Sequence, residues 1–219
     1  MGLPSITPYA MPQDLPAGRV DWRPDPARAV LLVHDMQNYF VDAFQRDASP
    51  IPALIANITV LRAVSDRLGV PVVFTAQPGA QTLEQRGLLQ DFWGPGIPAD
   101  PQAAAIIADL APRGGDTLLT KWRYSAFQRT DLHRLLAEQG RDQLIVTGVY
   151  AHIGCLMTAC EAFMSDIEPF FVADAVADFS AAHHAQALQY AADRCARLLT
   201  TSDVTGALAS AADLSSARA

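Results

Sequence analysis

The sequence predicts an α/β protein, in which a parallel β-sheet lies between two layers of helices. Short apolar runs alternate with longer segments of helical spacing along the 219 residues. The runs are rich in branched side chains and lack polar alternation, which is typical of strands buried on both faces. Strands that alternate with helices form right-handed βαβ units. We therefore expect one three-layer α/β/α domain with a six-stranded, parallel, Rossmann-like sheet.

The predicted elements follow one another in a regular order. Strands are expected at residues 29–34, 70–76, 116–120, 143–149, 169–173 and 196–200. Helices are expected at residues 51–68, 101–110, 131–139, 154–166 and 181–195.

Local signals support these boundaries. The first strand is apolar until its last residue, and the fourth is strongly β-branched. Gly69 and Gly140 each follow a helix, where glycine commonly forms the C-cap. Pro101 stands where helices often begin, and the last helix is rich in alanine. The small, polar residues after Asp203 predict a frayed tail.

Composition indicates a single domain over residues 1–219. Half of the residues are hydrophobic, which suffices for a sizeable core, and no repeat or Gly/Ser linker divides the chain. We place the core at residues 25–204 and interpret residues 1–24 as an extended, proline-containing arm, and we expect no carrier domain. The formal net charge of −7 and the lack of a basic cluster argue against nucleic acid and membrane partners.

The cysteines and the N-terminus predict a cytoplasmic protein. The N-terminus lacks the basic and apolar segments of a signal peptide. No apolar run approaches the roughly 20 residues that span a bilayer. Cys155, Cys160 and Cys195 are odd in number and form no C-x-x-C pair, which is typical of a reducing compartment.

Functional side chains follow four of the predicted strands. Asp35 comes directly after the first strand, Gln77 after the second, Lys121 after the third and Tyr150 after the fourth. Ligands of open parallel sheets bind outside the carboxyl ends of the strands. We therefore expect a carboxylate, an amide, a cation and an aromatic ring to converge at one edge of the sheet.

Three of the charged residues also have ordinary structural interpretations. Asp35 could be a helix N-cap, and Lys121 could be an exposed surface charge. Arg86, in the long connection after the second strand, suits the capture of a carboxylate. It could instead form a surface ion pair with Glu84 or Asp91.

The sequence predicts neither a cofactor nor a metal site. No glycine-rich phosphate loop follows a predicted strand, and Gly94-Pro95-Gly96 reads as a turn. His34 is expected to be a satisfied core residue. His183 and His184 are adjacent on a helix and so face different directions, and neither a helical His pair at i, i+4 nor a carboxylate set has the spacing of metal ligands.

Six segments resemble those of isochorismatases, including the 2,3-dihydroxybenzoate siderophore enzymes and their phenazine-pathway relatives. The segments are LLVHDMQ at 31–37, TAQP at 75–78, DFWGPG at 91–96, KWRYSAF at 121–127, GVYAHIG at 148–154 and VADAVADFS at 172–180. The resemblance extends from about residue 4 to about residue 204 and implies an isochorismatase-like hydrolase fold. It also implies hydrolysis of the enolpyruvyl ether of isochorismate to pyruvate and 2,3-dihydro-2,3-dihydroxybenzoate. The alternative substrate is 2-amino-2-deoxyisochorismate, which gives trans-2,3-dihydro-3-hydroxyanthranilate.

The resemblance also bears on the nucleophile. The wider superfamily includes nicotinamidases, in which a cysteine nucleophile ends a Gly-x-x-[Thr/Ala]-x-x-Cys segment. Alignment on Gly148 puts Gly154 at that position and Cys155 one residue later. One residue is about 100° of helical rotation, so Cys155 is expected to pack rather than react. The resemblance implies a cis peptide between Val149 and Tyr150. A cysteine amidase and a non-catalytic binding protein are the less favoured alternatives.

The implied reaction begins with proton transfer to the methylene carbon of a vinyl ether. Asp35 is the candidate acid, although an ordinary aspartic acid has a pKa of about 3.9. We expect Lys121 and Arg86 to bind the substrate carboxylates and thereby let Asp35 hold its proton. Gly154 is expected to leave room for the substrate and to present its N–H to an anionic oxygen.

The remaining residues of the expected pocket lie in the segments that follow the strands. Gln77 and Tyr150 are hydrogen-bond candidates. Phe40, Trp93 and Tyr124 are candidate apolar walls, with ordinary packing as the alternative for Trp93. The expected partner is a small anionic substrate, without a cofactor, and the resemblance implies a homodimer or a higher homo-oligomer.

Overall fold

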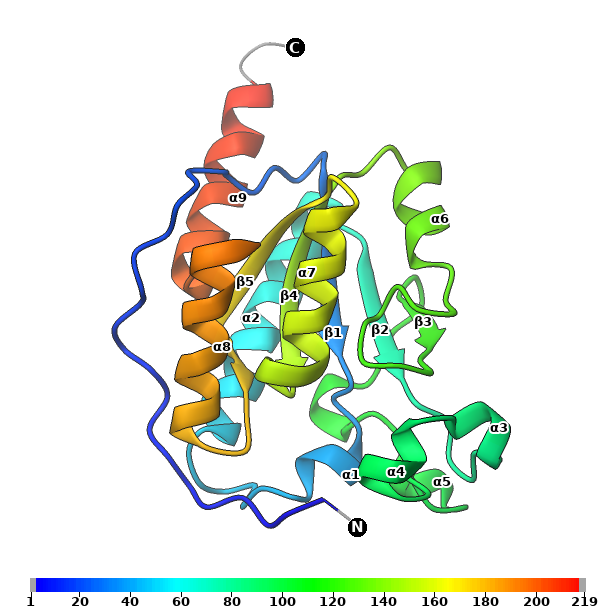
Figure 1. The fold of residues 1–219 in the computed structure, drawn as a ribbon. Helices are drawn as coiled ribbons and strands as arrows, with labels where there is room; N and C mark the ends of the chain where they lie inside the picture. The colour runs from blue at the N-terminus through cyan, green and yellow to red at the C-terminus, as the bar shows by residue number, and fades with distance from the viewer. Residues whose placement is uncertain (1–2, 217–219) are drawn as a thin grey trace.

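The fold has three layers, with a parallel sheet between two sets of helices (Figure 1). The computed structural model describes residues 3–216, and within this range the sheet has six strands in the order β3-β2-β1-β4-β5-β6. All neighbouring strands pair in parallel. The predicted fold class is therefore confirmed, while the predicted domain limits at residues 1 and 219 lie outside the described residues.

The elements have the following bounds. The strands are β1 Ala29–His34, β2 Val72–Ala76, β3 Thr117–Thr120, β4 Gln143–Val149, β5 Glu168–Ala177 and β6 Arg197–Leu199. The helices are α1 Asn38–Val41, α2 Ile51–Leu68, α3 Leu83–Arg86, α4 Leu89–Trp93, α5 Pro101–Ala104, α6 Leu132–Glu138, α7 Leu156–Met164, α8 Ala181–Arg194 and α9 Thr201–Ser216. A 3₁₀ turn at Ala108–Leu110 and a π-helical turn at Ala151–Cys155 complete them.

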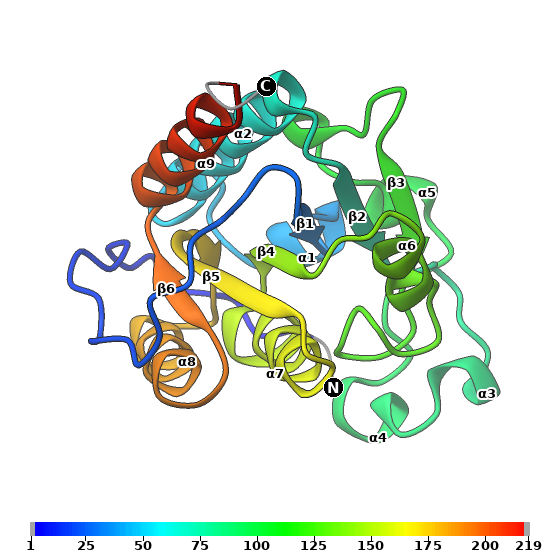
Figure 2. The same cartoon turned by 90° about the horizontal axis from the view of Figure 1, so that it is seen from above.

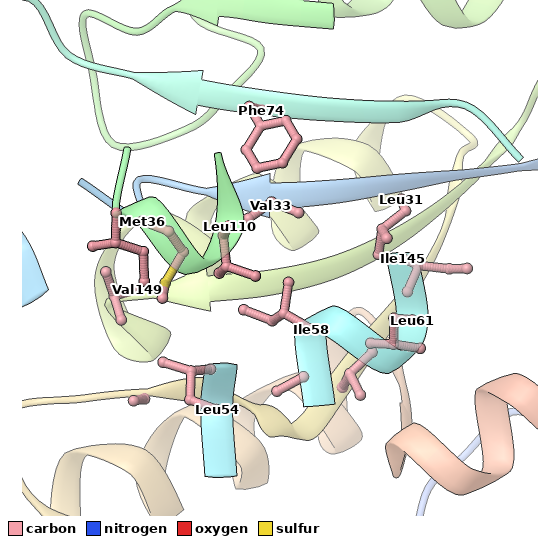
Figure 3. Close-up of a cluster of buried hydrophobic side chains, with 14 of the residues drawn as sticks. Leu31, Val33, Met36, Leu54, Ile58, Leu61, Phe74, Leu110, Ile145 and Val149 are labelled. Carbon is pink, nitrogen blue, oxygen red and sulfur yellow. The ribbon is translucent and has the colours of Figure 1, made fainter. Parts of the chain in front are cut away.

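Two apolar clusters flank the sheet, because successive side chains of a strand point to opposite faces. Along β1, Leu31 and Val33 belong to one cluster, and Val30 and Leu32 belong to the other. Helices α2 and α9 cover the first face, and α6, α7 and α8 cover the second (Figure 2). Figure 3 shows the first cluster, in which side chains of α2 face those of β1 and β4.

Strand β1 lies in the middle of the sheet, between β2 and β4. All six of its residues are buried. This position brings the residue after β1 to the centre of the carboxyl edge of the sheet, within reach of the ends of its neighbours.

Several boundaries differ from those expected from the sequence. The predicted helix 101–110 is α5 followed by the 3₁₀ turn, and the fifth strand extends to Ala177 rather than residue 173. The short helices α1, α3 and α4 were not expected. They have four or five residues each, which is too short for a helical period to be visible in the sequence.

The prediction of a frayed tail after Asp203 is wrong for residues 204–216, which belong to α9, while residues 217–219 lie outside the described residues. The N–H of Thr200 donates to a carboxylate oxygen of Asp203 at 2.9 Å, and the N–H of Asp203 donates to Oγ1 of Thr200 at 3.1 Å. This is a reciprocal cap at the start of a helix. Val204 and Leu208 lie one turn apart and are fully buried in the first cluster. The cap and this small apolar stripe hold the helix against α2.

No helix in residues 3–216 combines the length and the apolar character that crossing a bilayer demands.

The burial of α9 can be tested with two leucines of the same helix. Leu208 is 0% exposed and Leu214 is 62% exposed. We expect Leu208→Ala to lower the free energy of unfolding by about 2–4 kcal/mol, because it leaves a cavity. Leu214→Ala should change it by less than about 0.5 kcal/mol. Urea denaturation measures both, and equal effects would show that α9 does not contribute to the core.

Candidate active site

Asp35 stands at the carboxyl end of β1 in the left-handed region of backbone conformation, with φ 49°. Aspartate tolerates this region better than most residues do. The Thr75 hydroxyl donates to its Oδ1 at 2.6 Å, and the Gln77 amide donates to its Oδ2 at 3.1 Å. The N-cap residue of the following helix, α1, is Gln37, and no side chain caps that helix. Asp35 is therefore held as part of a buried site and is not the N-cap of α1.

Lys121 pairs with Asp35 across the ends of β1, β2 and β3. Its Nζ lies 2.9 Å from Oδ2 of Asp35, and the two side chains are 2% and 5% exposed. The ammonium also donates to the carbonyl oxygens of Arg123 at 2.6 Å and Tyr124 at 3.4 Å. Lys121 is thus a buried cation, not a surface charge. Its three N–H donors already have acceptors within the chain, which differs from the expectation that it binds a substrate carboxylate.

The surroundings of Asp35 favour its ionised form. Burial raises its pKa, but the charge of the Lys121 ammonium and the hydrogen bond from the Thr75 hydroxyl lower it by more, so that the pKa lies below its usual value. Burial lowers the pKa of His34, which keeps the imidazole neutral. At neutral pH the free site therefore holds a carboxylate–ammonium pair.

Arg86 provides a second buried cation, on α3 above the end of the sheet. Its Nε donates to the carbonyl oxygen of Gly94 at 2.9 Å, and Nη1 donates to Oε1 of Gln77 at 3.3 Å. A Cβ at Gly96 would lie 2.8 Å from Cζ of Arg86, so this glycine makes room for the guanidinium. The proposed surface pair with Glu84 or Asp91 is absent, and Arg86 has no acidic partner among residues 3–216.

The missing side chain at Gly154 makes room for the His34 imidazole, and because Gly154 also lines the pocket, its role in leaving room for substrate stays a prediction. A Cβ at residue 154 would lie 2.1 Å from Cε1 of His34. The ring cannot easily move, since Nδ1 lies 2.9 Å from the Val149 carbonyl oxygen and Nε2 lies 3.3 Å from that of Tyr124. His34 also lines the pocket. The sequence gives no signal for this contact, because His34 and Gly154 are far apart in the chain and only the tertiary structure brings them together.

All nine predicted site residues, together with Val149, line one pocket at this edge of the sheet, whose empty space of about 560 Å³ includes solvent at its open mouth. The predicted lining residues are Asp35, Phe40, Gln77, Arg86, Trp93, Lys121, Tyr124, Tyr150 and Gly154. Lining residues without a predicted role are Leu3, His34, Tyr39, Leu89, Gly96, Ile97, Ile153 and Phe179.

The aromatic residues form walls that are fixed by hydrogen bonds. The Trp93 indole N–H donates to the Tyr124 hydroxyl at 2.7 Å. The Tyr150 hydroxyl donates to the carbonyl oxygen of Phe40 at 2.8 Å, so its proton is already engaged. The ring of Phe179 lies 4.4 Å from that of Tyr150. Phe179 was missed because nothing in the local sequence distinguishes it from a core residue.

The turn after β4 has the features that the resemblance implied. The Val149–Tyr150 peptide bond is cis. Cys155 is fully buried in the second cluster, and its thiol lies 3.9 Å from the carbonyl oxygen of Thr147. Burial raises the pKa of this thiol well above its usual value. Cys155 is absent from the pocket lining and therefore packs, as expected, rather than presenting a thiolate.

Known proteins resemble the chain over most of its length. The Isochorismatase domain family matches residues 29–203. A protein named isochorismatase from Bacillus subtilis is 58% identical over 213 residues, which cover 96% of this chain and 68% of that protein. The phenazine biosynthesis protein PhzD of Pseudomonas fluorescens is 52% identical over 210 residues, 93% of this chain and 98% of that protein.

Solved structures agree with this comparison. The structure of an isochorismatase family protein from Burkholderia thailandensis matches with a TM-score of 0.76 and 25% identity, over 90% of this chain and 100% of that one. A cysteine hydrolase from Pseudomonas syringae shares the fold with a TM-score of 0.79 at 22% identity, over 91% of this chain and 100% of that one.

The parallel sheet and the buried acid–cation pair at its carboxyl edge define a hydrolase with the isochorismatase-like fold. More particularly, the chain belongs to the isochorismatase family.

The contact between Gly154 and His34 leads to a test by substitution. We expect Gly154→Ala to displace the His34 ring and to lower the free energy of unfolding by about 1–3 kcal/mol, as overpacking does. The rate of turnover should also fall, because His34 lines the pocket. Gly206→Ala is the matched control, because a Cβ at Gly206 meets nothing within 4 Å. Thermal denaturation and turnover report the outcome, and a Gly154→Ala variant that resembles the control would refute the close contact.

Proposed function

We propose that this enzyme hydrolyses the enolpyruvyl ether of isochorismate, releasing pyruvate and 2,3-dihydro-2,3-dihydroxybenzoate. The observation that carries the proposal is a pocket in which buried Asp35 lies near buried Arg86, a cation without an acidic partner among the described residues. None of the described lining residues is a cysteine. Relatives named isochorismatase and enterobactin synthase component B support the choice of substrate.

The proposed chemistry requires a positioned acid and no covalent intermediate. Asp35 delivers a proton to the methylene carbon of the vinyl ether, which leaves an oxocarbenium ion. The resulting carboxylate stabilises that cation. Water adds to the cationic carbon and returns a proton to the Asp35 carboxylate, which gives a hemiketal. The hydroxyl proton of the hemiketal then passes to the oxygen on the substrate ring as the bond between that oxygen and the former vinyl carbon breaks. This last step yields pyruvate and the ring alcohol.

The residues around Asp35 have separate roles in this proposal. Thr75, Gln77 and Lys121 each contact its carboxylate and fix its orientation. Arg86 is the cation that binds a substrate carboxylate, because Lys121 has its donors engaged within the chain. The negative charge of the bound substrate raises the pKa of Asp35 and lets it take up the proton that it delivers.

A second candidate substrate is 2-amino-2-deoxyisochorismate. The similarity to PhzD, a protein named for phenazine biosynthesis, favours it. The reaction at the ether is the same, so the pocket chemistry applies to both substrates. A coupled pyruvate assay with the two substrates side by side decides between them, by the ratio of their kcat/KM values. Without pyruvate release from either, the proposed function would be wrong.

Replacement of the acid tests its role directly. We expect Asp35→Asn to lower kcat by about 10²-fold to 10⁴-fold or more, because the amide cannot donate the required proton. Substrate binding should change by less than about tenfold. The assay temperature is kept below the unfolding transition of the variant, because loss of the Asp35 charge leaves buried Lys121 without its anionic partner and lowers stability. Asp91→Asn, an exposed change on α4, is the control and should retain activity.

The pH dependence follows from the depressed pKa of Asp35. The free enzyme loses this proton at a pH below the ordinary aspartate value, and the proposed reaction requires its return. We therefore expect kcat/KM to fall by up to about tenfold per pH unit as the pH rises above that pKa. Stopped or continuous pyruvate assays from pH 5 to 8 measure this. A profile that is flat or rises over that range would contradict proton delivery by Asp35.

We also propose that the enzyme works in the cytoplasm as a homodimer or a higher homo-oligomer. Its three free cysteines support a reducing compartment. The exposed apolar side chains of Met157, Phe163 and Met164 on α7 support contact between copies. Analytical ultracentrifugation would determine the state, and a monomer at micromolar concentration would exclude this part of the proposal.

A further inference from the structure

The N-terminal arm connects the two edges of the sheet. Residues 3–24 run from the carboxyl edge, past α8, to the amino edge where β1 begins (Figure 1). The arm is fixed at the carboxyl edge. The N–H of Ile6 donates to the Ala43 carbonyl oxygen at 2.8 Å, and that of Tyr9 donates to Ser49 at 3.1 Å. Ile6 and Met11 are buried in the first core cluster.

The start of the arm reaches the active site. Leu3 lines the pocket together with Phe40 and Tyr39 of the α1 region. The pocket therefore has an apolar wall that comes from a segment distant in sequence from every strand end.

Tyr9 joins the arm to the segments after β5. Burial lowers the pKa of His184, which is thus neutral, and its Nε2 lies 3.0 Å from the Ala173 carbonyl oxygen. A carbonyl only accepts, so Nε2 carries the proton and Nδ1 accepts. The Tyr9 hydroxyl, 3.1 Å from Nδ1, must therefore donate to it. Its oxygen in turn accepts the N–H of Asp178 at 2.7 Å.

Asp178 connects that chain to the pocket walls. Its carboxylate is 0% exposed and accepts the backbone N–H of His152 at 2.6 Å and that of Phe179 at 2.7 Å. It also contacts Nδ1 of the His152 ring at 2.6 Å. His152 belongs to the π-helical turn that contains Gly154. One buried carboxylate thus holds the turn after β4 and the turn after β5.

Both turns contribute directly to the pocket. Phe179 stands 4.4 Å from the Tyr150 ring and 5.9 Å from that of Trp93, measured between ring centroids. Ile153 and Gly154, which follow His152, are lining residues. Loss of the Tyr9 hydroxyl would leave the N–H of Asp178 buried without an acceptor and would loosen these walls.

We propose that the N-terminal arm is a functional part of the active site: Leu3 closes one side of the pocket, and Tyr9, through Asp178, is a positioning residue for Phe179 and the Tyr150–Gly154 turn. For its kinetic consequences the inference rests on the proposed function. Neither residue contacts Asp35, so both act on substrate binding and leave the proton transfer largely intact.

The test compares two arm variants with matched controls in the full-length enzyme. Tyr9→Phe should raise KM by roughly tenfold, because a buried hydrogen bond is left unmade, and should change kcat by less than about threefold. Tyr190→Phe, which removes the hydroxyl of an exposed tyrosine of α8, should match the wild type.

Leu3→Ala should raise KM by about threefold to tenfold, because it removes apolar contact area from the pocket wall. Leu3→Met, which keeps the volume, should restore the wild-type KM. Leu15→Ala changes an arm leucine that packs against the second core cluster, away from the pocket, and should leave KM unchanged. A purely structural role for the arm would lower thermal stability in Leu3→Ala and Leu15→Ala alike and leave KM unmoved.

Hydrogen–deuterium exchange gives a readout without substrate. In Tyr9→Phe the amides of His152 and Phe179 should exchange at least about tenfold faster than in the wild type, while those of β1 stay protected. If neither KM nor exchange changes in Tyr9→Phe and Leu3→Ala, the inference is wrong. If the wild type releases no pyruvate, the proposed function fails, and the exchange rates still decide whether Tyr9 holds the two turns.

Discussion

The active site depends on the buried ion pair between Asp35 and Lys121, which joins the ends of the central strand and an outer strand. Two charges in a water-poor interior are tolerated only when each finds enough polar partners. Thr75 and Gln77 supply donors to the carboxylate, and two backbone carbonyls accept from the ammonium. The arrangement favours the ionised form of Asp35 in the free enzyme, so the proposed reaction requires the bound substrate to raise the pKa of this carboxyl.

The backbone at Gly154 packs directly against the end of the central strand. His34 occupies the volume that a side chain at 154 would need, and Cys155 lies in the opposite core. The pocket is lined by a buried carboxylate, Asp35, and by a buried cation, Arg86, that has no acidic partner among the described residues. The proposed substrate, a vinyl ether with carboxylates, matches these two features, because protonation of carbon needs an acid and binding of an anion needs a cation.

Much of the fold could be predicted from sequence, because buried parallel strands are continuous apolar runs and glycines mark helix ends. The same reasoning failed where structure depends on a partner distant in sequence. Helix α9 has a weak local pattern and forms because Val204 and Leu208 meet α2. Helix α3 begins with a capping box between Thr82 and Gln85, and Arg86 at its end donates to the Gly94 carbonyl oxygen after α4, a contact that no periodicity reveals.

For the site, the sequence by itself determined which chemical groups follow the strands, and therefore that Asp35, Gln77 and Lys121 meet at one edge of the sheet. Parallel pairing brings strand ends together whatever the details of the loops. Only the tertiary structure decided that Lys121 is engaged within the chain, that His34 fills the space at Gly154, and that Leu3 reaches the pocket. These contacts join residues far apart in the chain, and their distances depend on packing that local sequence does not encode.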